Sequence, residues 1–562
     1  MSISKYEIRA GAYYDSVVLM QLQKSLAGLE GVVDAGVVMA TPANRDLLQA
    51  TGFDLSNMEE AGPDDLLIVV NAGSEAEAAL AINQVDELLR RRRSTETHDF
   101  RPRSLKGAVD ALPDAKWVLI SIPGRYAAGV TEEALDLNKH VFLYSDNVAL
   151  EDEIRLKRKA RETGLLLMGP DCGTAVINGI GLGFANRLRP GNIGIVAASG
   201  TGLQAVSTGV HNLGGGVSQA IGTGGRDLKK EVGGISARQA LDLLGRDPQT
   251  EVIVLISKPP DATVVTELLA AAQATGKPTV INFIGFAAPG EQLGNLKFAV
   301  NLKEAAALAV DMSSRASSSP AADKPVRVSS DAPYLRALFS GGTLAYEALL
   351  ALQTVLSPIY SNIPIWPEQQ LANSLVSQAH TVLDLGEDEF TQGRLHPMMD
   401  NDLRLRRLHQ EAGDPAVGLI MLDVVLGEGA HPDPAAELAP AIAQVRASRG
   451  IEVVAIVLGT DEDPQDVGKQ VRALEQVGAV VFRETADAVL YAAERLRPEV
   501  SYDYLPLPLA DFDGELAAIN VGLESFYESL KNQGTNAIQV DWRPPAGGNE
   551  KLMAILAKMR TK

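Results

Sequence analysis

The chain has 562 residues, which is too long for one hydrophobic core and predicts roughly three to five domains. Its composition, 46% hydrophobic and 22% charged, is typical of a soluble protein, and its formal net charge of −20 argues against a nucleic-acid-binding surface, which needs clustered Lys and Arg. The one cysteine, Cys172, excludes an internal disulfide and favours a reducing compartment. No stretch approaches the ~18 uninterrupted apolar residues of a membrane span, and the first residues do not form a signal peptide. We therefore expect a cytoplasmic protein with neither a nucleic-acid nor a membrane partner.

Residues 1–92 predict a small α+β domain with an open sheet. The expected strands are YEIRAGAY, VVDAGVVMA and DLLIVVNA, and the expected helices are SVVLMQLQKSLAGL and EAEAALAINQVDELLRR. The polar stretch RRRSTETHDFRPRS then interrupts this pattern and indicates a linker.

From about residue 105 short apolar strands alternate with helical segments, as in a parallel sheet that is covered on both faces. Examples are WVLISIPG, KHVFLYSD, NIGIVAAS, VIVLISKP and PTVINFIG. The Ser-, Ala- and Pro-rich stretch 311–331 predicts a second linker, after which AVGLIMLDVVLG and IEVVAIVLG continue the pattern. We therefore expect an α/β fold of several doubly wound parallel sheets, with domains over 105–188, 189–312 and 332–502. Residues 503–562, with strands AAINVG and AIQVDW and a helix KLMAILAKM, are expected to form a C-terminal extension.

The usual nucleotide and hydrolase motifs are absent from the sequence. There is no Walker A pattern, no G-x-G-x-x-G at a strand-to-helix turn and no G-x-S-x-G elbow. The seven histidines lack the spacing of metal ligands, so no metal site is predicted.

Two similar glycine turns are the strongest local signal for a ligand site. IVAASGTGLQAV and RALFSGGTLAYEAL each pass from an apolar strand through Ser-Gly into a helix. The unpaired N–H groups and partial positive charge of a helix N-terminus suit a phosphate or carboxylate, although a simple capped helix has the same pattern. The repetition in adjacent domains favours an anion site, and pseudo-twofold packing would direct both helix ends at one phosphate. The predicted phosphate-binding residues are Ser199, Gly200, Thr201, Gly202, Ser340, Gly341, Gly342 and Thr343.

These motifs resemble a known family. MGPDCGT, the ASGTG turn, AIGTGGRDLKKEVGG and VIVLISKP are similar to the α subunit of succinyl-CoA synthetase, and SGGTLAYEA, TVLDLGEDE and LIMLDVVLGEG to the C-terminal domain of its β subunit. The resemblance implies a CoA-binding-like Rossmann domain over 105–188 and two flavodoxin-like ligase domains after it. With TPANRDLL, GRLHPMMD and WRPPAGGN, nearly the whole chain resembles the FdrA family.

The departures from the synthetase decide which function the resemblance implies. The nucleotide-binding ATP-grasp part has no counterpart, and GFAAPGEQLGNLKFAV contains no histidine where the synthetase carries its phosphohistidine. The FdrA resemblance instead implies a subunit of oxamate carbamoyltransferase in allantoin breakdown, which converts oxalurate and phosphate to oxamate and carbamoyl phosphate. This enzyme needs no metal or organic cofactor, because carbamoyl phosphate is already activated, and we expect other subunits and an oligomer to complete its active site.

Further site residues follow from polar side chains in loops after the expected strands. Arg394 in GRLHPMMD suits the binding of a carboxylate or phosphate, although it alternatively pairs with the preceding acids. His396 suits either hydrogen-bond donation to the carbamoyl oxygen or proton transfer near neutral pH. Arg226 in GTGGRDL is a further catalytic candidate, with a local Arg–Asp pair as the alternative. Lys258 in SKPP and Asp384 in TVLDLGEDE are assigned to substrate binding, whereas Cys172 is expected to be a small buried residue.

Two alternatives to the carbamoyltransferase remain open. The first is a CoA-dependent acyl ligase in which CoA binds this chain and another chain supplies the ATP-grasp part. The single glycine before the helix in WVLISIPGRYAAG weakens this alternative without excluding it. The second is a non-catalytic subunit that senses phosphate or a carboxylate.

Overall fold

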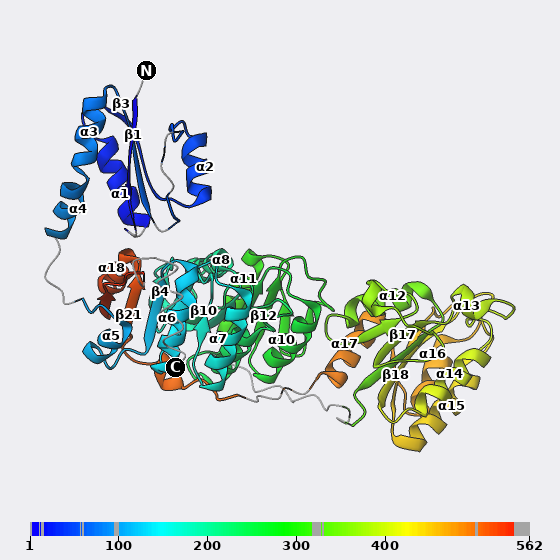
Figure 1. The fold of residues 1–562 in the computed structure, drawn as a ribbon. Helices are drawn as coiled ribbons and strands as arrows, with labels where there is room; N and C mark the ends of the chain where they lie inside the picture. The colour runs from blue at the N-terminus through cyan, green and yellow to red at the C-terminus, as the bar shows by residue number, and fades with distance from the viewer. Residues whose placement is uncertain are drawn as a thin grey trace, which may run out of the picture. The chain divides into compact units, whose positions relative to one another are not determined.

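The computed structural model describes residues 3–10, 12, 16–56, 58, 61–63, 65–94, 101–316, 328, 331–498, 500 and 504–544. Contacts divide the chain into two units, one made of Met1–Gly173, Ile180–Phe184 and Ala510–Lys562, the other of Thr174–Gly179 and Ala185–Leu509. The predicted mixed α/β fold with several parallel sheets and a small N-terminal domain is confirmed (Figure 1). Within the described ranges, no helix combines the length and hydrophobicity that crossing a bilayer requires.

The N-terminal domain is an antiparallel sheet of order β1-β3-β2 with helices on both faces. Its central strand is buried throughout, and alternate residues face opposite sides. Leu66, Ile68 and Val70 pack with α1, whereas Leu67 and Val69 pack with α2. The elements are β1 (Ile3–Arg9), α1 (Ser16–Ala27), β2 (Val32–Met39), α2 (Pro42–Ala50), β3 (Leu66–Ala72), α3 (Glu75–Asn83) and α4 (Val85–Ser94).

A parallel five-stranded sheet of order β22-β21-β4-β5-β6 joins two distant parts of the sequence. Residues 503–562 were expected to form a separate extension, but β21 and β22 complete the sheet that β4 begins, and the predicted helix KLMAILAKM lies outside the described residues. The elements are α5 (Leu105–Ala111), β4 (Trp117–Ser121), α6 (Gly124–Asp136), β5 (His140–Leu143), α7 (Leu150–Glu162), β6 (Leu167–Met168), β21 (Ala517–Gly522), α18 (Glu524–Asn532) and β22 (Asn536–Val540).

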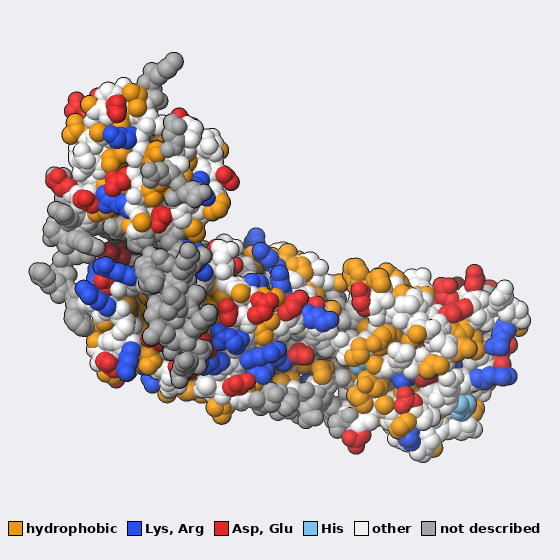
Figure 2. Space-filling view, viewed as in Figure 1, with side chains coloured by type: hydrophobic (Ala, Val, Ile, Leu, Met, Phe, Trp, Pro, Cys, Tyr) orange, Lys and Arg blue, Asp and Glu red, His pale blue; other side chains and the backbone are white. Residues whose placement is uncertain are grey.

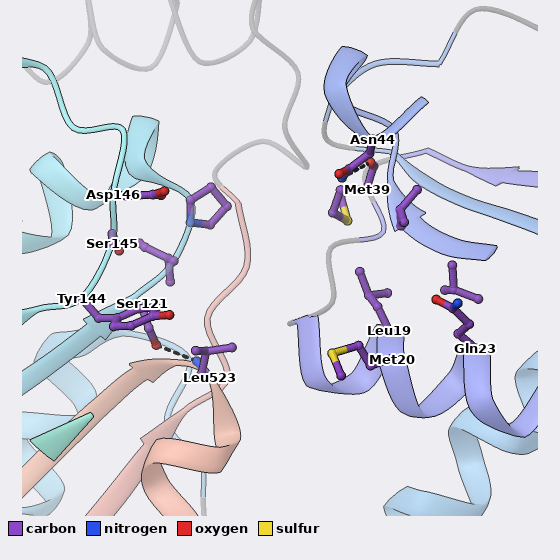
Figure 3. A pocket seen from close by; sticks show the side chains of 14 residues that line it. Leu19, Met20, Gln23, Met39, Asn44, Ser121, Tyr144, Ser145, Asp146 and Leu523 are labelled. Atoms are coloured by element: carbon purple, nitrogen blue, oxygen red, sulfur yellow. Dashed lines mark hydrogen bonds between the residues drawn. The ribbon is translucent and has the colours of Figure 1, made fainter. Parts of the chain in front are cut away.

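Two sets of contacts hold the distant segments of this sheet together. His140 stacks on Trp117 with ring centroids 4.8 Å apart, and its Nε2 lies 3.2 Å from Asp511 Oδ2. At the carboxyl edge, Ser121 Oγ accepts a hydrogen bond of 2.8 Å from Leu523 N (Figure 3). The C-terminal segment is therefore an integral part of this domain.

An eight-stranded sheet of order β13-β14-β12-β11-β9-β10-β7-β8 follows, with parallel strands at its centre. Apolar side chains of α8 and α11 pack on one face, and α9 packs on the other, where Gly194 meets Leu244. The elements are β7 (Thr174–Ile177), β8 (Ile180–Gly183), β9 (Pro190–Ala197), α8 (Gly200–Asn212), β10 (Val217–Gly222), α9 (Ile235–Arg246), β11 (Val252–Ser257), α10 (Ala262–Ala274), β12 (Thr279–Phe283), β13 (Gln292–Leu293), β14 (Leu296–Phe298) and α11 (Leu302–Ala316).

A six-stranded sheet of order β16-β17-β15-β18-β19-β20 is parallel throughout. Strands β15 and β18 are neighbours, but the strand that follows β15 in the chain, β16, lies on one side of this pair and the strand that follows β18, β19, lies on the other. Such a reversal of strand order forms a crevice at the carboxyl edge of the sheet. The elements are β15 (Tyr334–Phe339), α12 (Gly342–Leu352), β16 (Ile359–Ser361), β17 (His380–Asp384), α13 (Asp388–Thr391), α14 (Asp402–Ala412), β18 (Val417–Val425), α15 (Pro434–Arg449), β19 (Glu452–Leu458), α16 (Val467–Gln476), β20 (Val480–Phe482) and α17 (Thr485–Leu496).

Candidate functional site

The first glycine turn, which we call the α8 end (residues 199–202), is a capped but still open helix start. Ser199 is the N-cap residue, and its Oγ accepts a hydrogen bond of 3.2 Å from Gly202 N. Gly200 is half-buried and Thr201 is exposed, and among the described residues no side chain accepts from their backbone N–H groups. The α8 end is therefore a capped helix whose next two N–H donors stay available, so the capped helix is observed and the anion site stays a prediction.

Two basic residues lie at the same edge of the eight-stranded sheet as the α8 end. Hydrogen bonds from Ala198 N to Ile256 O and from Thr223 N to Ala197 O place this turn between the ends of β11 and β10. Lys258 follows β11 and is exposed, and the half-buried Arg226 lies in the loop after β10. The chain leaves β9 and β11 toward opposite sides of the sheet, so the α8 end and Lys258 lie beside the crevice that such sheets use for ligands.

Asp227, the expected local partner of Arg226, has a structural task of its own. It is fully buried and accepts hydrogen bonds from Ser236 N (3.2 Å) and Ala237 N (2.9 Å) at the start of α9. Its carboxylate thus stabilises that helix end and shapes the loop that carries Arg226.

The second glycine turn, the α12 end (residues 340–343), is filled by a side chain of the protein itself. Asp423 of β18 is fully buried, and its Oδ1 accepts from Ser340 N at 2.7 Å. Ser340 Oγ donates to both carboxylate oxygens at 2.9 Å, and Gly341 N donates to Oδ2 at 3.1 Å. The donors of Ser340 and Gly341 that the sequence assigned to phosphate therefore already hold a carboxylate.

Arg404 of α14 balances the buried charge of Asp423. Its side chain is 4% exposed, and its Nη2 lies 3.2 Å from Asp423 Oδ1 and also donates to the backbone O of Asp423. Burial lowers the pKa of Arg404, and the Asp423 charge opposes this effect. Asp423 therefore occupies the donors of Ser340 and Gly341, and Arg404 balances its charge. As at the α8 end, no side chain among the described residues accepts from the first two helical N–H groups, those of Gly342 and Thr343.

A second carboxylate and a histidine lie beside the α12 end. Asp384 ends β17, is 4% exposed, and accepts from Gly386 N at 2.8 Å. Burial raises the pKa of Asp384, and the charges of Glu387 and Asp423 raise it further, against the lowering effects of the Gly386 N–H and His396.

The glycines at this point allow the close approach of these groups. An ideal Cβ on Gly386 would lie 2.9 Å from His396 Nε2 and 3.0 Å from Asp384 Oδ1, and one on Gly342 would lie 2.6 Å from Asp384 Oδ2. His396 Nε2 and Asp384 Oδ1 are consequently no more than about 6 Å apart, since each is about 3 Å from one point. A side chain at either glycine would displace the carboxylate.

The remaining predicted residues lie apart from this cluster. Arg394 is exposed, and within the described residues it makes no ion pair with the acids that precede it. Thr343 is exposed as well, although it belongs to the α12 end. Cys172 is 2% exposed, which confirms a small buried residue. No cluster of three or more potential metal ligands occurs in the part of the chain that the structure describes.

The sequence analysis missed Asp423 and Arg404. The signal for Asp423 was present, because it is the one charged residue in the apolar strand AVGLIMLDVVLG. A charge in a strand that is buried on both faces needs a partner, and here Arg404 supplies it.

Comparison with known proteins defines the class to which this fold and site belong. The model of a CoA binding domain matches residues 189–285, and that of a CoA-ligase domain matches residues 338–495. A third model, described as the heavy metal-associated domain of AllF, matches residues 1–103. The chain is thus a succinyl-CoA synthetase-like protein with the fold of an acyl-CoA ligase.

The chain belongs to the family of an Escherichia coli protein that is named "Uncharacterized protein YahF". The two are 40% identical over 504 residues, which cover 87% of this chain and 98% of YahF. Succinate–CoA ligase subunit alpha 2 of Archaeoglobus fulgidus is 29% identical over 199 residues, 34% of this chain and 67% of that subunit. The solved acetyl-coenzyme A synthetase 1 of Ca. Korarchaeum cryptofilum aligns with 69% of this chain and 85% of its own, at 16% identity and a TM-score of 0.28.

The residues of the N-terminal domain do not fit the metal that its family description implies. Residues 1–103 contain no cysteine, and the one cysteine of the chain, Cys172, lies outside them. The thiolates that soft metal ions prefer are therefore missing from this domain, and its described residues contain no cluster of His, Cys, Asp and Glu that could replace them.

Proposed function

We propose that this chain is a subunit of an acyl-transferring enzyme of the acyl-CoA ligase type, with the anionic part of its substrate bound at the α8 end. The observation that carries the proposal is the difference in charge between the two helix ends. The open N–H groups of the α8 end share a sheet edge with Lys258, whereas the α12 end lies against the carboxylates of Asp423 and Asp384. The α8 end also lies within the segment that matches the CoA binding domain.

The residues around the α8 end suit the phosphates of CoA. Helix-end N–H groups and the Lys258 ammonium are donors that phosphate oxygens accept, and Arg226 lies in the adjoining loop. When bound, CoA supplies the thiol that takes up the acyl group. The protein's own part is to fix the anion, exclude water and stabilise the carbonyl oxygen as it gains negative charge.

Carbamoyl transfer is the second candidate, and a specific observation favours it. The segment 284–300 has no histidine, and the α12 end holds Asp423, so this chain has neither the group nor the second helix end for a phosphoryl relay. A reaction between oxalurate and phosphate that yields oxamate and carbamoyl phosphate needs no such relay. In that case the α8 end would hold the phosphate. A third function, anion sensing without catalysis, needs only the same site.

We expect a partner chain in either reaction. No ATP-grasp part exists in the sequence, and hydrophobic side chains gather on one face of the six-stranded domain (Figure 2). Tyr346 and Leu350 of α12 are 46% and 39% exposed, although both are large and apolar. Such exposed side chains suit a second subunit.

Calorimetric titration of the full chain with CoA, inorganic phosphate and carbamoyl phosphate separates these functions. Gly200→Val would narrow the α8 end, and Gly129→Ala, which adds a methyl group in open space on α6, is the control. CoA binding that only Gly200→Val weakens would support the ligase type. Binding of phosphate or carbamoyl phosphate that only Gly200→Val weakens, without binding of CoA, would support carbamoyl transfer. Binding of none of the three would contradict both reactions.

A further inference from the structure

His396 is held in one tautomer by the backbone of its own loop. Its Nδ1 accepts a hydrogen bond of 3.2 Å from Met398 N, so the neutral imidazole carries its proton on Nε2. The loop is itself fixed, because Met398 O accepts from His431 N at 2.8 Å and His396 O accepts from Met399 N at 2.8 Å. The ring therefore presents a donor, and its acceptor nitrogen is already in use.

The Nε2–H group faces the carboxyl edge of the six-stranded sheet. His396 Nε2 is the ring nitrogen that is directed toward Gly386 and Asp384, because an ideal Cβ on Gly386 would lie about 3 Å from both Nε2 and Asp384 Oδ1. The negative groups at this point are Asp384, Asp423 and Glu387, and Arg404 neutralises Asp423. A negative charge on the side of Nε2 favours the proton at Nε2, which reinforces the effect of the Met398 N–H on the other side of the ring.

The structure assigns His396 as a fixed hydrogen-bond donor for the carbonyl oxygen of the transferred group, with Asp384 as the residue that positions it. The inference goes beyond the proposed function and rests on its acyl-transfer chemistry, and it is common to both candidate reactions, because acyl and carbamoyl groups each develop negative charge on a carbonyl oxygen. His396 gives up no proton in this step. It donates a hydrogen bond while the bond from the acceptor atom to the carbonyl carbon forms and the leaving group departs with its electron pair.

The first test reads the tautomer and needs no substrate. The full chain is labelled with ¹⁵N-histidine, and two-bond ¹H–¹⁵N correlations are recorded, with His396→Gln identifying the signal. We expect the Nε2–H tautomer in the wild type and a larger fraction of Nδ1–H in Asp384→Asn, because the carboxylate no longer favours Nε2–H. Asp388→Asn, which changes an exposed acid at the start of α13, should leave the tautomer unchanged. A wild-type ring with its proton on Nδ1 would overturn the inference.

The second test uses the reaction that the titration identifies. His396→Ala should lower kcat about 100-fold with little change in KM, since it removes one oxyanion donor. Glutamine can donate a hydrogen bond but cannot shuttle a proton, so His396→Gln should restore much of the loss. The exposed His409→Gln on α14 is the matched control. A His396→Gln variant as inactive as His396→Ala would overturn the donor role. If none of the three compounds binds, the proposed function is refuted. The NMR measurement of the His396 tautomer still tests the inference in that case, because it needs no substrate.

Discussion

Replacing Asp423 with alanine tests whether the α12 end is an anion site that the protein fills by itself. The change removes the acceptor of Ser340 N, Ser340 Oγ and Gly341 N and leaves Arg404 buried without a counter-charge. Breaking a buried ion pair in this way costs about 3–5 kcal/mol. For a domain of this size each kcal/mol lowers Tm by about 2–4 °C, so we expect a loss of about 6–20 °C.

The same variant should gain a ligand. Formate has the carboxylate that Asp423→Ala lacks, and the bare N–H groups and Arg404 remain to bind it. At 100 times its dissociation constant, formate would restore about 2.7 kcal/mol. Thermal melts of the wild type and of Asp423→Ala in formate, with chloride at equal ionic strength as the control, measure both effects.

Two results would refute this account of Asp423. The first is a fall in Tm of less than about 2 °C, since a carboxylate with four buried partners cannot be so dispensable. The second is the absence of any formate-specific rise in the Tm of Asp423→Ala. The double variant Asp423→Leu/Arg404→Met separates charge from packing, because it removes both ions and should lose less stability than Asp423→Ala.

Four further outcomes are expected. Lys258→Ala should weaken anion binding about 10-fold by calorimetry, because Lys258 follows β11 at the sheet edge where α8 begins. Lys106→Ala should not, because the exposed Lys106 lies on α5, which packs on the five-stranded sheet. Burial and the Arg336 charge lower the pKa of His380 to about 4. Because His380 is protonated at a higher pH in the unfolded chain than in the folded one, stability is lost as pH falls from about 6.5 to about 4. Urea unfolding should show a loss of about 2 kcal/mol between pH 7 and 5, and His380→Asn should abolish this loss. Burial raises the pKa of Asp384, so its neutral form is favoured in the folded state and this stabilisation is lost as pH rises. Asp384→Asn should therefore increase the free energy of unfolding at pH 7 in urea melts, and the gain should vanish at acidic pH, where the carboxyl is protonated in both states. A chain that stops at residue 509 should fail to protect the amides of β4 from hydrogen exchange, because β21 no longer pairs with it.

Local patterns in the sequence were enough to predict the main elements of the fold. The apolar runs that end in Gly, Pro or Asp form the strands of the three parallel sheets, because strands buried on both faces must be apolar along their whole length. The pairing of β4 with β21 could not be predicted in this way. It joins Trp117 to Ala518, and no local preference links positions so far apart.

The same limit explains the outcome at the two glycine turns. Both turns pass from a strand through Ser-Gly into a helix, so their similar local sequences predicted equivalent sites. They differ because Asp423, 83 residues beyond Ser340, folds back into one of them. His396 could be chosen from the chemistry of its side chain, but its tautomer depends on the Met398 N–H, which only the loop geometry reveals.

The divided five-stranded sheet has a consequence for how this protein is made. During translation β4, β5 and β6 leave the ribosome early, whereas β21 begins almost 400 residues after β4 ends. Through all that time one edge of β4 has no partner strand, and an unpaired apolar edge invites pairing with other chains. The eight- and six-stranded domains complete their own sheets before β21 is synthesised. The nascent chain therefore has an open edge in its first half until its last segment arrives, which makes this step the one at which a chaperone would matter most.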